Sequence, residues 1–143
     1  MVRKILKKQK INTKLRKELL KPTKIYSKEI LSLVKKNLIH SAAHITGGGL
    51  VENLLRSIPN NLSLEIDLSK IKILKIFKWL KKNNISDNDM MGTFNCGIGF
   101  CIILPRHNIK KIRKFFSKKF SPYEIGFISK KNRKIFLHNT LKW

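Results

Sequence analysis

Three consecutive glycines, Gly47, Gly48 and Gly49, separate a short run of small and apolar residues from a segment with helical periodicity. Residues 41–46 predict a buried strand, and apolar residues at every fourth position over 50–58 predict a helix that ends at the following proline. Glycine has no Cβ and accepts positive φ angles, so this run permits a sharp connection. The fold is therefore expected to pack a strand and a helix closely around this turn.

The glycine turn allows two interpretations. Backbone N–H groups at the start of a helix can converge on an anion, which would make the turn a phosphate site. Alternatively, the glycines only let the helix and the strand pack closely. The segment is neither a P-loop nor a dinucleotide fingerprint, because no Gly-Lys-Ser/Thr follows and Glu52 stands where the third glycine would be. Glu52 could orient a sugar hydroxyl or a metal, or it could complement the helix dipole.

A second glycine-containing segment spans 92–100 and enters another β-rich run. Its two closely spaced glycines predict a bulge or a close backbone approach, with Thr93 and Asn95 as polar neighbours. Cys96 and Cys101 lack a metal-ligand spacing and are expected to be small buried hydrophobic residues.

Metal binding by protein side chains is not expected. His40 and His44 on one strand would lie roughly 13 Å apart at about 3.3 Å per residue. The acidic pairs at 65 and 67 and at 87 and 89 are explained as solvated strand edges and helix caps.

The remaining segments alternate irregularly between helical and strand patterns, which indicates an α/β or α+β layered fold in a single domain over 1–143. Helices are expected over 2–9, 26–36, 73–82 and 107–119, with a further helix starting at 86–89 and a loosely helical or irregular link at 11–20. Strands are expected over 62–66, 97–104, 123–128 and 134–137, the first of them half-buried.

The charge is strongly basic, with 32 Lys and Arg against 8 Asp and Glu and a formal net charge of +24. Such a surplus attracts nucleic acid or other anionic surfaces. We favour a solvated lysine coat, because 26 of the basic residues are lysines and aromatic residues make up only 8%, whereas specific base recognition uses arginine forks and stacking rings. The longest apolar run, 98–104, is too short to span a membrane, and lysines interrupt any signal-peptide core, so a cytoplasmic location is expected.

Three blocks occur in the order known from one enzyme family: Leu-Leu-Lys-Pro-Thr-Lys-Ile-Tyr at 19–26, His-Ile-Thr-Gly-Gly-Gly with a following Glu-Asn at 44–53, and Thr-Phe-Asn-Cys-Gly-Ile-Gly at 93–99. With them, residues 2–128 resemble the C-terminal part of aminoimidazole ribonucleotide synthetase, the phosphoribosylformylglycinamidine cyclo-ligase of purine biosynthesis. The resemblance implies a mixed sheet packed with helices.

The resemblance also implies a reaction. ATP, with magnesium, activates the amide oxygen of formylglycinamidine ribonucleotide, and a substrate nitrogen then closes the imidazole ring. No catalytic base is assigned. The candidate substrate or phosphate contacts are Thr46, Gly47, Gly48, Gly49, Asn53, Thr93 and Asn95.

From the resemblance, we expect this chain to lack the N-terminal ATP-binding domain and to start inside the C-terminal-type domain, and Gly92 replaces an arginine that is common in the family. We therefore expect a C-terminal fragment, or a subunit that joins a separate N-terminal-domain polypeptide, and no activity from the chain alone. The full-length family forms homodimers. The alternative is a lysine-rich, non-enzymatic protein that binds nucleic acid or anionic surfaces.

Overall fold

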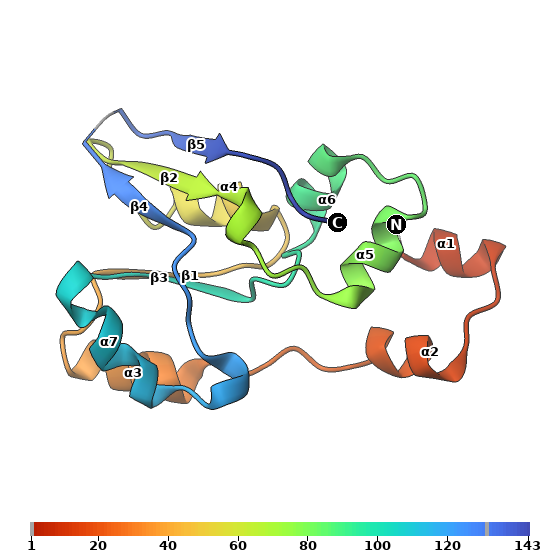
Figure 1. Cartoon of the computed structure of the whole chain (residues 1–143), viewed down its shortest axis with the longest axis horizontal. Helices are drawn as coiled ribbons and strands as arrows, with labels where there is room; N and C mark the ends of the chain where they lie inside the picture. The colour runs from red at the N-terminus through yellow and green to blue at the C-terminus, as the bar shows by residue number, and fades with distance from the viewer. Residues whose placement is uncertain (1, 131) are drawn as a thin grey trace.

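The described part of the chain, residues 2–130 and 132–143 of a computed structural model, forms two small sheets (Figure 1). The first sheet is an antiparallel pair of β1 and β3, and the second has the order β4-β2-β5, with β2 antiparallel to β4 and parallel to β5. The strands are β1 (Ser41–His44), β2 (Ser63–Asp67), β3 (Phe100–Ile103), β4 (Gly126–Ser129) and β5 (Ile135–His138).

Helices pack around both sheets, which confirms the α+β fold class. In the view of Figure 1, α3 and α7 lie below the β1–β3 pair, and α1, α2 and α5 gather at the opposite end of the molecule. The α-helices are α1 (Val2–Lys8), α2 (Thr13–Leu19), α3 (Ser27–Lys35), α4 (Gly49–Leu55), α5 (Lys75–Lys81), α6 (Asp87–Thr93) and α7 (Ile109–Ile112). The 3-10 turns are η1 (Leu68–Lys70), η2 (Arg106–Asn108), η3 (Arg113–Phe115) and η4 (Lys118–Phe120).

The apolar residues form two core clusters. The larger cluster joins β1, α4 and β2, with Ile45, Leu54 and Ile66 each 2% exposed. The smaller cluster lies between α5 and α6 and includes Leu80. Trp143 packs against both clusters. Burying each of these large side chains stabilises the fold by about 1.5–3 kcal/mol, so the two clusters hold the sheets and helices together.

Most of the expected elements are present, and the polar start of α6 is confirmed, because Ser86 caps it by accepting a hydrogen bond from the backbone N–H of Asp89 at 3.1 Å. The segment 11–20 contains a regular helix, α2, whose start is capped by Asn12. No helix in the described residues is both long and apolar enough to cross a bilayer.

The long helix expected over 107–119 is wrong. The segment divides into η2, the four-residue α7, η3 and η4, with Phe116 in extended conformation. Asn108 stands where a helix cap is needed, but its side chain donates to the carbonyl of Leu38 at 3.1 Å instead. Among the described residues, no side-chain hydrogen bond caps the start of α7, and the helical conformation ends at Phe116, which is extended with φ −115° and ψ 144°.

The expectation that β2 is half-buried, with a solvated Glu65, is also wrong. Residues 63–66 of β2 are buried on both faces because β2 is the central strand of its sheet. Glu65 is 7% exposed, and its carboxylate accepts a hydrogen bond from the Ser129 hydroxyl at 2.9 Å and lies 2.7 Å from His138 Nε2. Polar partners on both neighbouring strands thus accompany the burial of this carboxylate.

Candidate functional site

The glycine turn joins β1 directly to α4. Beyond the strand, the Ile45 N–H donates to the Gly99 carbonyl at 3.0 Å, and the Gly49 N–H then donates back to the Thr46 carbonyl at 3.1 Å. Gly48 caps α4 with a φ of +89°, and Gly49 follows with a φ of +65°. Both angles lie in the left-handed region that glycine adopts without strain. The sequence therefore needs glycine here to close the turn.

Close packing of α4 on α6 adds a second requirement for glycine. A Cβ on Gly49 would overlap the carbonyl oxygen of Met91 in α6. By contrast, a Cβ on Gly47 would meet nothing within 4 Å. The contact between Gly49 and Met91 brings the exposed Thr93, at the end of α6, beside the glycine turn.

Asn53 fixes the shape of the turn from inside. It is 7% exposed, and its Nδ2 donates to the carbonyls of Gly49 at 2.7 Å and Gly47 at 3.2 Å. Its Oδ1 accepts a hydrogen bond from Arg56 Nη2 at 2.7 Å. Because both ends of the amide are engaged within the protein, Asn53 is a positioning residue for the turn.

Glu52 lies over the start of α4. The residue is exposed, but its carboxylate comes so close to Gly48 that a Cβ there would overlap Oε2. A carboxylate in the first turn of a helix complements the positive end of the helix dipole. The arrangement therefore favours the dipole interpretation of Glu52, and an anion at the turn would have to displace this carboxylate.

The second glycine segment forms a turn between α6 and β3. Asn95 Oδ1 accepts a hydrogen bond from the Gly97 N–H at 3.0 Å, while Cys96 and Gly97 have φ angles of 49° and 111°. A Cβ on Gly97 would crowd the Lys72 carbonyl. Asn95 therefore stabilises the turn that leads into β3.

The first of the three sequence blocks, 19–26, meets the other two at one end of the β1–β3 pair. The Tyr26 hydroxyl lies directly over Gly99, where a Cβ would overlap it. The Tyr26 ring centroid is 6.0 Å from that of His44 and 5.2 Å from that of Phe100, and the His44 and Phe100 rings stack at 5.6 Å. Burial raises the pKa of the Tyr26 hydroxyl, which keeps it neutral. The structure thus joins three sequence blocks in one aromatic cluster.

This aromatic cluster was not singled out as a site in the sequence. The sequence places His44 in the 44–53 block and predicts no metal site with His40, and the structure shows that His44 is the cross-strand partner of Phe100. Predicting this cluster requires the pairing of β1 with β3, because facing residues in an antiparallel pair lie on the same side of the sheet.

Lys24 contacts the edge of the aromatic cluster and a carboxylate of α3. Its Nζ lies 2.5 Å from Glu29 Oε1, 5.0 Å from the Tyr26 ring centroid and 4.9 Å from that of Phe120. The hydrogen bond from Lys24 lowers the pKa of the Glu29 carboxyl. A cation between two rings and a carboxylate ties the block at 19–26 to the start of α3.

An open hollow of about 350 Å³ lies beside the turn, between β1 and α4. Its lining includes His44, Asn53 and Arg56. Within residues 2–130 and 132–143, no three His, Cys, Asp or Glu side chains are grouped so that they could hold a metal ion. The hollow thus offers polar and cationic contacts to a ligand.

The model of the AIR synthase related protein family, C-terminal domain, matches residues 1–139. The chain belongs to this family. The match to the AIR synthase C-terminal domain includes all three sequence blocks.

Two bacterial relatives of this AIR synthase domain carry the name phosphoribosylformylglycinamidine cyclo-ligase. The protein of Ligilactobacillus salivarius is 43% identical over 125 residues, which cover 84% of this chain and 36% of the relative. That of Streptococcus pneumoniae is 41% identical over 119 residues, covering 82% of this chain and 34% of the relative. The chain thus spans about a third of the length of these relatives.

A third relative is an insect protein with several activities in its name. The trifunctional purine biosynthetic protein adenosine-3 of Chironomus tentans is 47% identical over 94 residues, which cover 65% of this chain and 7% of the relative. The AIR synthase domain therefore also occurs within a much larger polypeptide.

Proposed function

We propose that this chain acts as the C-terminal part of a phosphoribosylformylglycinamidine cyclo-ligase, which closes the imidazole ring of aminoimidazole ribonucleotide. The family match over residues 1–139 carries the proposal. The hydrogen bond from the Ile45 N–H to the Gly99 carbonyl supports it, because this bond joins two of the sequence blocks.

In this proposal, the residues divide by role. The Thr46 and Thr93 side chains and the backbone of Gly47 contact polar groups of formylglycinamidine ribonucleotide, and a phosphate group reaches the backbone of Gly48 only when it displaces the Glu52 carboxylate. Asn53 and Asn95 hold the two turns in shape through the hydrogen bonds described above. Preorganised donors of this kind are effective because they need no rearrangement when charge develops.

ATP and magnesium would have to be held elsewhere. No group of three potential metal ligands exists in the described residues, and Glu52 lies over the start of α4. We therefore assign the nucleotide and the metal to an N-terminal domain. This domain belongs either to the same polypeptide, in a homodimeric full-length enzyme, or to a separate subunit. In both cases we place the enzyme in the cytoplasm. The isolated chain is expected neither to hydrolyse ATP nor to form product.

A chimera tests this function. The corresponding C-terminal part of the Ligilactobacillus salivarius relative would be replaced by this chain, and formation of aminoimidazole ribonucleotide would be measured. We expect the chimera to be active. Thr46→Val or Thr93→Val in the chimera should lower kcat/KM by roughly tenfold or more, as loss of one polar contact does. Thr140→Val, at an exposed position near the C-terminus, is the matched control and should leave kcat/KM unchanged.

Two results would contradict the proposal. One is a folded chimera that binds no formylglycinamidine ribonucleotide. The other is steady product formation by the pure 143-residue chain without a second polypeptide.

A further inference from the structure

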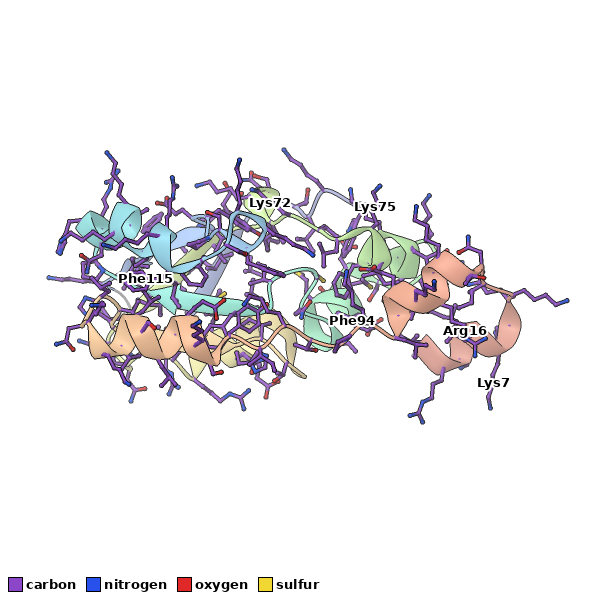
Figure 2. All side chains as sticks on the ribbon, turned by 90° about the horizontal axis from the view of Figure 1, so that it is seen from below. Lys7, Arg16, Lys72, Lys75, Phe94 and Phe115 are labelled. Atoms are coloured by element: carbon purple, nitrogen blue, oxygen red, sulfur yellow. The ribbon has the colours of Figure 1, made fainter. Side chains whose placement is uncertain are left out.

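A groove of about 630 Å³ lies between the C-terminal end of α3 and the α7–η3 segment, away from the glycine turn. Its lining consists of three exposed lysines, Lys36, Lys111 and Lys114, and two partly buried apolar side chains, Leu38 and Phe115. Figure 2 shows Phe115 on the side of the molecule where α3 and α7 face each other. The groove therefore combines aromatic and aliphatic surface with three cationic side chains.

The two walls of the groove are held in place by buried contacts. Leu33 of α3 is 0% exposed and Ile112 of α7 is 3% exposed, so both helices are anchored in the interior. Asn108, which is 5% exposed, donates to the Leu38 carbonyl at 3.1 Å and ties the two walls together. A groove with anchored walls is formed before any ligand arrives, which lowers the entropic cost of binding.

The lysines of the groove carry uncompensated charge. In the described part of the chain, no carboxylate lies within ion-pair distance of Lys36, Lys111 or Lys114. The sequence has no Asp or Glu from 90 to 123, whereas that stretch contains seven Lys and Arg. Lys114 also lies 5.8 Å from the centroid of the Phe115 ring. A polyanion with flat rings fits this combination of charge and aromatic surface.

We propose that this groove binds single-stranded RNA without sequence preference. Phosphates contact the three lysines, and one unstacked base packs on Phe115. A duplex would keep its bases stacked inside the helix, out of reach of the Phe115 ring. The lining has no arginine, amide or hydroxyl group to read base edges, so recognition depends on charge and stacking.

The test separates this groove from the general lysine coat. Binding of a fluorescein-labelled uridylate dodecamer would be followed by anisotropy between 50 and 300 mM salt. The groove variant K36Q/K111Q/K114Q would be compared with K4Q/K7Q/K8Q on α1, which removes the same charge. Figure 2 shows that Lys7 lies at the opposite end of the molecule from Phe115. Circular dichroism would confirm that both variants are folded.

We expect the groove variant to lose at least tenfold more affinity than the α1 variant. The slope of log K against log salt should fall by about 2, because each phosphate contact with a single strand contributes about 0.7. Phe115→Leu keeps the charge and most of the apolar volume, and should weaken binding by about tenfold at unchanged slope, as loss of one stacked base predicts.

Three outcomes would overturn the proposal. Equal losses in the two lysine variants would mean that only the overall charge attracts RNA. Wild-type affinity in folded Phe115→Leu would exclude stacking in the groove. If uridine monophosphate displaced the labelled dodecamer as well as the unlabelled dodecamer does at the same nucleotide concentration, the ligand would be a mononucleotide. Because none of these measurements involves ring closure, their result is independent of the proposed ligase function.

Discussion

Gly49 lies against the carbonyl oxygen of Met91 with no space for a side chain between them. This contact lies in the interface of α4 with α6, and the hydrogen bond from the Ile45 N–H to the Gly99 carbonyl joins two separate sequence blocks nearby. The contact of Gly49 with Met91 also separates two explanations for the glycine run. Gly49 is required by helix packing, whereas Gly47 has open space around its Cα and is not.

Substituting these two glycines should therefore have different effects. Gly49→Ala places a Cβ in the Met91 carbonyl at a φ of +65°, and we expect it to lower the free energy of unfolding by at least about 2 kcal/mol. Gly47→Ala, the matched control, should change it by less than about 0.5 kcal/mol. Urea unfolding of both variants measures the difference. Equal stabilities would show that α4 and α6 are not packed as described.

Asn53→Ala tests the hydrogen bonds inside the turn. The substitution leaves the Gly49 carbonyl without its 2.7 Å donor and Arg56 without its acceptor. An unsatisfied buried polar group costs about 1–3 kcal/mol, and we expect a loss of stability in this range. Asn61→Ala, at an exposed position, is the control and should be nearly neutral. An unchanged free energy of unfolding in Asn53→Ala would contradict the positioning role of this residue.

The pair of Lys24 and Glu29 should make stability depend on acid pH. The hydrogen bond from Lys24 lowers the pKa of Glu29 in the folded chain below its ordinary value of 4.5. The folded state thus favours the charged carboxylate, so this contribution is complete above pH 4.5 and decreases as the pH falls through the lowered pKa. Urea unfolding of the wild type and Glu29→Gln from pH 7 to pH 3 should show a stability difference that shrinks toward low pH. A constant difference would contradict the linkage.

Both cysteine thiols should react slowly in the native protein. Burial raises the pKa of Cys96 to about 11 and that of Cys101 to about 12. Because the thiolate is the reactive form, alkylation by iodoacetamide at pH 8 should be at least about a hundredfold slower than in the unfolded chain. The rate before and after unfolding in guanidinium chloride gives the comparison. Fast labelling of the folded chain at either thiol would show that its site is open.

Local sequence patterns determined much of the secondary structure. The apolar spacing at 26–36 and 73–82 predicted α3 and α5, and Ser86 predicted the start of α6. The three sequence blocks also pointed to the family that the comparison confirmed. These features depend on neighbours a few residues apart, so periodicity and capping chemistry reveal them directly.

Only the tertiary structure decided which of these segments meet. Strand pairing brought Tyr26, His44 and Phe100 together, and the central place of β2 buried Glu65. The hydrogen bond from Asn108 to the Leu38 carbonyl tied the segment just before α7 to a residue that lines the lysine groove. A sequence pattern shows which face of an element is apolar but does not name the partner of that face, because the partner is chosen by packing between residues far apart in the chain.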